Sequence, residues 1–151
     1  MVSLSARVIT ALKTAIRREE NTSQVYQDKA RKMRDPKIKT LLESLAKQET
    51  AHATKLQRVL EKGDLTLIGQ SRSPSVFARL ALQNDDVREM GKQTEAAGVI
   101  RWAVKAEANS YRFYAGLAKL SKGLDLGEVF TRLADEELKH KARLEAVLVR
   151  L

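Results

Sequence analysis

Apolar residues recur every three or four positions along four long stretches of the chain, a spacing that places them on one face of an α-helix. The stretches cover roughly residues 8–33, 38–60, 94–118 and 126–151. The first ends before Asp35 and Pro36, a turn sequence whose proline suits the first position of a second helix. The second ends at Lys62 and Gly63, where the glycine favours termination of the helix. The pattern therefore predicts four helices of about 25 residues each, a length that is common in helical bundles.

The predicted connections between these helices differ in length. A few residues join the first helix to the second and the third to the fourth, so we expect two antiparallel hairpins, at about residues 3–62 and 94–151. Residues 63–93 combine glycine, serine and proline with a short apolar patch, which predicts a crossover with one or two short helices. Two duplicated hairpins joined by a long crossover are typical of an all-α, ferritin-like antiparallel four-helix bundle, and we expect residues 1–151 to form this single domain.

Each predicted apolar stripe is interrupted by ionisable residues at core-facing positions. The first and third helices each have one glutamate there, and the second and fourth each have a Glu-x-x-His motif: Glu19, Glu49, His52, Glu107, Glu137 and His140. The helical spacing places all six at one level of the bundle interior. Burying a single unpaired carboxylate costs several kcal/mol, so four buried together require compensating charge.

The two halves of the chain are related by an internal repeat. Shifting residues 12–58 by 88 positions overlays them on residues 100–146 without a gap, and 10 of the 47 pairs are identical. All six interrupting residues fall on identical pairs, and these pairs include both histidines of the protein. Tyr26 and Tyr114 form another identical pair. We infer a duplicated helical hairpin in which each copy supplies one glutamate and one Glu-x-x-His motif.

This set of side chains suits a pair of metal ions. Residues three positions apart share a face of a helix, so Glu49 and His52 can reach one ion together, as can Glu137 and His140. The glutamates of the first and third helices can bridge or chelate. Carboxylate and imidazole ligands favour iron or manganese, and two divalent ions would neutralise four carboxylates. We predict two bound metal ions, which can be iron, manganese or a mixed pair, while a buried Glu/His network without metal is the competing interpretation.

Tyr26 and Tyr114 each lie seven residues, or two helical turns, after a predicted metal-binding glutamate. Each tyrosine therefore faces the same side of its helix as that glutamate. As candidate catalytic residues, the two can donate hydrogen bonds that support ligating carboxylates, or their rings can simply pack in the core. The sequence leaves both interpretations open.

The sequence resembles the ferritin-like di-iron carboxylate proteins, and among them the rubrerythrins most closely. The resemblance is carried by residues 15–26, 45–52, 103–114 and 133–140, which contain the six predicted ligands. It implies a di-iron oxidoreductase that reacts with O2 or hydrogen peroxide, as a peroxidase or ferroxidase in oxidative stress or iron handling. It also implies a homodimer formed through helix faces.

Two features differ from those of typical rubrerythrins. Those proteins have a further carboxylate one turn after the third-helix glutamate, where this chain has Ser110 and, at the matching position of the first half, Thr22. They also usually carry a rubredoxin-like iron site built from four cysteines, whereas this chain has no cysteine. The resemblance then implies an erythrin domain alone, supplied with electrons by an external donor protein.

Composition and charge limit the other function classes. The absence of cysteine excludes disulfides, thiolate metal sites and a cysteine nucleophile. The chain has 28 Lys and Arg against 19 Asp and Glu, a net charge of +9. A basic cluster at residues 29–39 holds six Lys or Arg and a single Asp. Such a cluster can contact nucleic acid or an acidic electron donor, but without an RNP-like motif we favour a solvated face with cations near a helix C-terminus.

We expect no membrane association and a cytoplasmic location. No stretch longer than about seven residues lacks a charge, far below the roughly 20 apolar residues that span a bilayer. The first residues contain Arg7 and Lys13 and no apolar run typical of a signal peptide. Besides the di-metal oxidoreductase, two functions remain as alternatives: a metal-binding or storage protein with little turnover, and a basic ferritin-like protein that associates with DNA.

Overall fold

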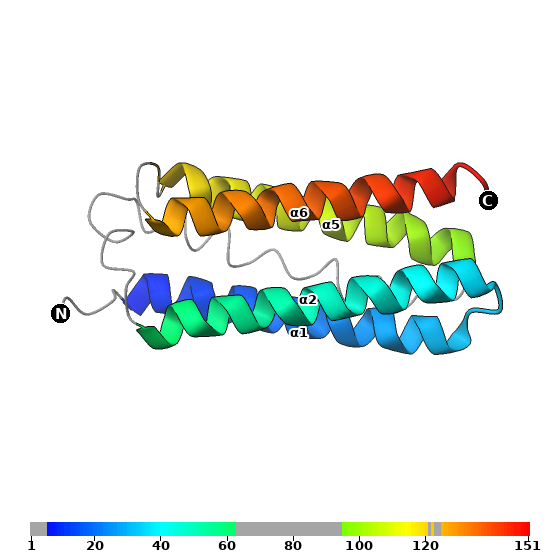
Figure 1. The fold of residues 1–151 in the computed structure, drawn as a ribbon, viewed down its shortest axis with the longest axis horizontal. Helices are drawn as coiled ribbons and strands as arrows, with labels where there is room; N and C mark the ends of the chain where they lie inside the picture. Colours follow the sequence, from blue (N-terminus) through cyan, green and yellow to red (C-terminus); the bar gives the residue numbers. More distant parts are fainter. Residues whose placement is uncertain (1–5, 63–94, 121, 123–124) are drawn as a thin grey trace.

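The chain folds into two antiparallel helical hairpins that lie side by side (Figure 1), and residues of both hairpins contribute to the same apolar clusters. The computed structural model describes residues 6–62, 95–120, 122 and 125–151. Its helices are α1 (Ala6–Lys32), α2 (Pro36–Lys62), α5 (Ala96–Leu120) and α6 (Asp125–Leu148). The described residues form these four helices and no strand, which confirms the predicted all-α four-helix bundle.

The turn between α1 and α2 shows why the first hairpin forms where the sequence predicted it. A side-chain oxygen of Asp35 accepts hydrogen bonds from the backbone N–H groups of Lys37, at 2.8 Å, and Ile38, at 3.4 Å. This caps α2, and Pro36 occupies the first helical position, where a backbone N–H would have no partner within the helix. The predicted crossover at residues 63–93 lies outside the described residues, and the single-domain boundary stays a prediction.

Two apolar clusters form the core, one toward each end of the bundle. The cluster nearer the α1–α2 turn is built on Tyr26, Leu42, Leu45, Val99, Ile100 and Leu144. The other is built on Leu12, Leu56, Phe113, Leu117, Phe130 and Leu133. The six ionisable core residues are spread over the four helices, and in each helix they lie between the residues of these two clusters. The packing on both sides therefore fixes the level at which these polar residues meet.

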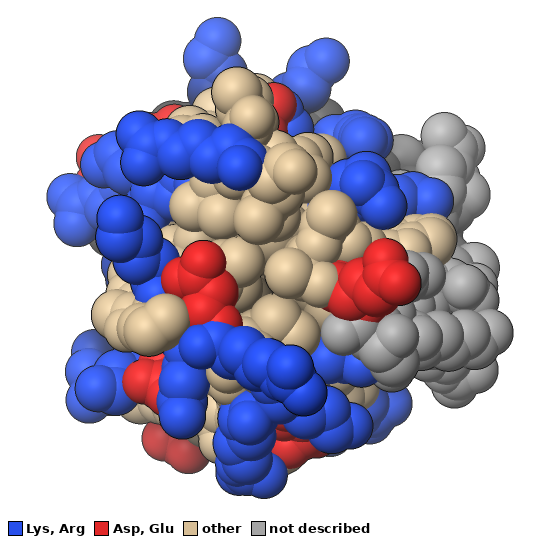
Figure 2. All heavy atoms as spheres, turned by 90° about the vertical axis from the view of Figure 1, so that its right-hand side faces the viewer, with Lys and Arg blue, Asp and Glu red and all other residues tan. Residues whose placement is uncertain are grey.

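Lys and Arg side chains dominate the end of the molecule at which α1 joins α2 (Figure 2). The basic cluster of residues 29–39 lies there, and its members are exposed except for Lys29, whose side chain is buried. Of the nearby acidic groups, Asp28 pairs with Arg31 at 3.2 Å and Asp35 caps α2. This end therefore presents net positive charge to the solvent. None of the described helices is long and apolar enough to cross a membrane.

Candidate metal centre

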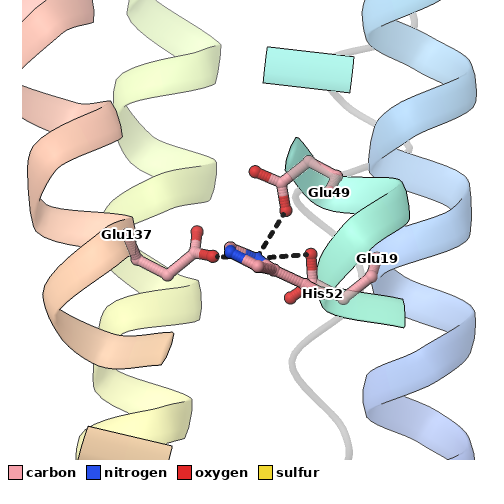
Figure 3. A group of neighbouring side chains, drawn as sticks. All are labelled: Glu19, Glu49, His52 and Glu137. Carbon is pink, nitrogen blue, oxygen red and sulfur yellow. Dashed lines mark ion pairs between the residues drawn. The ribbon is translucent and has the colours of Figure 1, made fainter. Parts of the chain in front are cut away.

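All six ionisable residues that the sequence singled out point into the bundle at one level. The residues are Glu19 of α1, Glu49 and His52 of α2, Glu107 of α5, and Glu137 and His140 of α6. Their exposed fractions are 3% or less. Figure 3 shows four of them, with Glu137 approaching His52 from the opposite hairpin. The structure thus brings together every predicted ligand residue.

These residues form two overlapping groups, each of which could hold a metal ion. The first group is Glu19, Glu49, His52 and Glu137, and the second is Glu49, Glu107, Glu137 and His140. In each group the potential ligand atoms all lie within 4.8 Å of one another. Glu49 and Glu137 belong to both groups, so these two carboxylates could supply oxygen ligands to either ion. The remaining residues divide evenly, with one glutamate and one histidine on each side.

The two imidazole rings direct the same nitrogen toward the carboxylates. Nδ1 of His52 lies 2.9 Å from an oxygen of Glu137 and 3.6 Å from oxygens of Glu19 and Glu49. Nδ1 of His140 lies 3.0 Å from Glu49, and its distances to the other carboxylates of its group are 3.5 and 4.0 Å. The rings stack with centroids 5.6 Å apart and planes inclined by 11°. This arrangement makes Nδ1 the nitrogen of each ring that is available to a metal ion.

Buried atoms without a hydrogen-bond partner concentrate in this centre. Among the described side chains, five of the six such atoms belong to it: Glu19 Oε2, His52 Nδ1, Glu107 Oε2 and both carboxylate oxygens of Glu137. The approach of Glu137 to His52 is short, but the two groups are not aligned as a hydrogen bond. Polar atoms buried in this way are costly unless they coordinate something. Carboxylate oxygens and imidazole nitrogens are ligands for iron or manganese, so the residues present fit a two-metal centre.

The four carboxyl groups divide into two protonation classes. Burial raises the pKa of Glu49 and of Glu137 well above 4.5, and the charges of neighbouring glutamates raise both further. Burial also acts to raise the pKa of Glu19 and of Glu107, but here hydrogen-bonding contacts with nearby glutamate and histidine side chains outweigh it. The pKa of Glu19 falls below 4.5, and that of Glu107 falls to about 2. The two shared carboxyls are therefore the ones that hold protons when no metal neutralises the site.

The pKa of His52 is raised by the carboxylates around it. Burial alone would lower the pKa of His52, but its contacts with the carboxylates of Glu19 and Glu49 raise the value from 6.5 to about 11. In the metal-free protein this imidazole is consequently protonated at neutral pH. It then supplies one positive charge among the four carboxyl groups.

The two repeat-related tyrosines donate hydrogen bonds to site glutamates of the opposite hairpin. The hydroxyl group of Tyr26 donates to Oε1 of Glu107 at 2.7 Å, and that of Tyr114 donates to Oε1 of Glu19. Burial raises the pKa of each hydroxyl well above 10, and the charge of the glutamate it contacts raises it further. Both tyrosines therefore remain protonated donors. Their part in catalysis stays a prediction.

Sequence reasoning missed a buried arginine next to the centre. The side chain of Arg18 is only 3% exposed, and its Nε donates to the hydroxyl oxygen of Ser110 at 2.9 Å. Its Nη2 donates to the backbone carbonyl of Ala106, also at 2.9 Å. A signal was available, since Arg18 lies three residues after Ala15 on the same buried helix face. However, Arg18 lies in a run of charged residues, so its position on the apolar face is not apparent from the sequence.

Gln48 and Glu136 are two further residues that the sequence did not single out. Each precedes a shared glutamate, and each contacts the outward nitrogen of a histidine on the opposite hairpin. Nε2 of His52 lies 2.5 Å from a carboxylate oxygen of Glu136, and Nε2 of His140 contacts the amide oxygen of Gln48. These contacts hold both rings with Nδ1 facing the centre.

A four-helix bundle with two overlapping Glu/His groups in its core defines the class of ferritin-like carboxylate proteins. The particular family follows from comparison with family models, in which the rubrerythrin model matches residues 10–148. The chain therefore belongs to the rubrerythrin family, whose members usually bind a di-iron centre. Comparison with curated proteins and with solved structures gave no match.

Proposed function

We propose that this protein binds two iron ions between its hairpins and reacts with O2 or hydrogen peroxide, as an oxidoreductase of the peroxidase or ferroxidase type. Manganese or a mixed pair of metals is the alternative occupant. The observation that carries the proposal is the convergence of five buried, unpartnered ligand atoms on two groups that share Glu49 and Glu137. Family membership supports the same assignment.

Each residue of the centre has a distinct part in this proposal. Glu49 and Glu137 would each supply ligand atoms to both positions, because they alone belong to both groups. Glu19 and His52 complete one position, and the equivalent pair on the other hairpin, Glu107 with His140, completes the second. When bound, two neighbouring iron ions supply two one-electron changes, which together match the two-electron reduction of peroxide to water.

The protein surroundings hold the ligands and limit access of water. The buried core clusters on both sides exclude bulk solvent from the centre. Tyr26 and Tyr114 hold in place the carboxylates of Glu107 and Glu19, which each belong to a single ligand group. Because the chain has no cysteine with which to build a rubredoxin-like iron site, we propose that electrons come from a separate donor protein. The homodimer and the cytoplasmic location also stay predictions.

Elemental analysis of protein purified without chelator tests the metal assignment directly. We expect about two metal atoms per chain, because two ligand groups are present. The variants Glu49→Ala and Glu137→Ala should retain far less metal, since each removes a carboxylate common to both groups. Glu43→Ala is the matched control, because Glu43 is an exposed glutamate on the same helix as Glu49. Equal metal content in all four proteins would overturn the assignment, provided that circular dichroism shows each variant to be helical.

The reaction itself is tested by mixing anaerobic, Fe(II)-loaded protein with hydrogen peroxide or with O2. We expect oxidation of the iron, followed by the appearance of ultraviolet and visible absorption from the ferric centre. Faster oxidation by peroxide would indicate a peroxidase, and faster oxidation by O2 a ferroxidase. A protein that binds two metal ions but reacts with neither oxidant would instead be a metal-binding or storage protein.

The DNA-associating alternative rests on the positively charged end of the bundle (Figure 2). A gel-retardation assay at low salt tests it separately from the metal chemistry. Electrostatic binding to DNA weakens steeply as salt rises, because each phosphate contact releases counterions. The absence of retardation at low salt would exclude this alternative.

A further inference from the structure

The outward nitrogens of the two histidines make different contacts, although the histidines are related by the internal repeat. Nε2 of His52, on α2, lies 2.5 Å from a carboxylate oxygen of Glu136, on α6. Nε2 of His140, on α6, contacts the amide oxygen of Gln48, on α2. The repeat shift of 88 residues places Gln48 and Glu136 at equivalent positions. One imidazole is therefore held by a carboxylate and its counterpart by a neutral amide.

The same contacts determine which nitrogen faces the centre. Glu136, when ionised, and the amide oxygen of Gln48 are hydrogen-bond acceptors, so Nε2 of each ring is the donor in its contact. Nδ1 is then left facing the carboxylates, and Nδ1 of His52 is among the buried atoms without a hydrogen-bond partner. Both rings thus direct Nδ1 toward the centre and Nε2 outward, and the acceptor behind Nε2 differs between them.

An acceptor behind a metal-binding imidazole changes how strongly that ring binds. A hydrogen bond to a carboxylate withdraws the Nε2 proton more strongly than a hydrogen bond to an amide does, because the acceptor carries a negative charge. The imidazole then becomes a better electron donor at Nδ1 and its orientation is fixed. Exchange of such an acceptor typically changes metal affinity by 10-fold to 100-fold.

We propose that the contrast between Glu136 and Gln48 makes the two metal positions unequal, so that the position completed by His52 binds its ion first and more tightly. Glu136 is a positioning residue in this proposal, because it acts through His52 and belongs to neither ligand group. The inference rests on the proposed two-metal function. It goes beyond that function by assigning an order to the two positions.

Exposure of Glu136 makes the proposal easy to test without damaging the core. Its side chain is 46% exposed, so an isosteric change there leaves the packing intact. The reciprocal changes Glu136→Gln and Gln48→Glu place an amide behind His52 and a carboxylate behind His140. Asp135→Asn is the matched control, because it removes one negative charge from an exposed neighbour of Glu136.

The protein has only two histidines, so nuclear magnetic resonance of the ring nitrogens reports on each position separately. We would titrate the metal-free protein with Zn²⁺ and follow both rings in long-range ¹H–¹⁵N spectra. The first equivalent should shift the His52 signals and the second those of His140. Glu136→Gln should weaken the first binding step by about tenfold and bring the two steps together, whereas Asp135→Asn should change neither.

The double variant Glu136→Gln/Gln48→Glu gives the decisive result. In this protein the carboxylate lies behind His140, so we expect the His140 signals to shift first. Simultaneous shifts of both rings in the unmodified protein, or an unchanged order in the double variant, would overturn the inference while leaving the two-metal centre in place. A protein that binds no Zn²⁺ at these rings would contradict the proposed function itself, and the inference with it.

Discussion

The hydroxyl group of Tyr26, on α1, donates a hydrogen bond of 2.7 Å to Oε1 of Glu107, on α5. The repeat-related contact runs in the opposite direction, from Tyr114 on α5 to Glu19 on α1. Each hairpin therefore supplies a donor to a carboxylate of the other. The two contacts link the hairpins at the level of the metal centre and hold the two glutamates that are not shared between the ligand groups.

Replacement of either tyrosine by phenylalanine should weaken both the fold and the metal site. Tyr26→Phe removes the donor from a buried carboxylate, which should lower the free energy of unfolding of the metal-free protein by about 1–2 kcal/mol. Metal affinity should fall as well, since Glu107 is then less well oriented. Urea denaturation and Zn²⁺ titration measure the two effects. Tyr111→Phe, at a partly buried position with no hydrogen bond to the centre, is the control, and an equal loss in both variants would contradict this role.

Arg18 provides a third link between α1 and α5, and this one has no counterpart in the second half. The repeat places Ala106 opposite Arg18, and it is the carbonyl of Ala106 that accepts from the guanidinium group. Ser110, at the position where the family resemblance implies a carboxylate, accepts from the same group. The matching hydroxyl of the first half, on Thr22, is buried without a hydrogen-bond partner. The two sides of the centre are consequently packed differently.

Arg18→Met should lower the free energy of unfolding by about 2 kcal/mol, because two buried acceptors on α5 lose their donor. Arg18→Lys should restore only part of this, since an ammonium group cannot reproduce the two-pronged geometry of a guanidinium. The adjacent Arg17 is exposed, so Arg17→Met is a control that removes the same charge without the buried contacts. Urea denaturation gives the comparison. A loss of similar size in the Arg17 variant would show that overall charge, and not the link to α5, is responsible.

The four helices and the shared level of the six ionisable residues could both be predicted from the sequence, because both follow from the periodic spacing of apolar positions. Glu49 and His52 interrupt an apolar stripe, and the repeat marks the same interruption at Glu137 and His140. The short Asp35–Pro36 turn could also be predicted, because helix capping depends only on residues adjacent in the sequence. Features that are both periodic and repeated can be found in a single sequence.

The contacts behind the histidines could not be predicted in this way. Gln48 and Glu136 occupy equivalent positions of the repeat but are different residue types, so the repeat does not mark them. Their partners lie on the opposite hairpin, and which side chain reaches which ring depends on how the two hairpins pack. The sharing of Glu49 and Glu137 between the two groups also emerges only from the packed structure. Periodicity places a residue on a helix face but does not choose its partner across the bundle.

The stability of the metal-free protein should decline as the pH rises above about 5. The pKa values of Glu49 and Glu137 are raised in the folded state, so their contribution is complete below 4.5 and is lost at higher pH. His52 contributes fully below 6.5 and loses its contribution as the pH rises toward about 11. Glu19 and Glu107 have lowered pKa values, so their contribution is present above 4.5 and is lost in acid. Thermal unfolding measured from pH 4 to pH 9 checks this profile.

The double variant Glu49→Gln/Glu137→Gln serves as the control for that profile. Neither amide can ionise, so the decline in melting temperature on the alkaline side should be smaller than in the unmodified protein. An equally steep decline in the two proteins would show that other groups control the pH dependence.

Metal binding at neutral pH should release protons, because Glu49, Glu137 and His52 hold them in the metal-free protein. We expect on the order of three protons per pair of divalent ions, and an affinity that rises with pH. Calorimetric titration with Zn²⁺ in buffers of different ionisation enthalpy measures the number, since the observed heat then varies with the buffer. Glu49→Gln should release about one proton fewer, as the amide has none to lose. A binding heat that is independent of the buffer would mean that the carboxyl groups and His52 are already deprotonated, and the electrostatic account of the centre would be wrong.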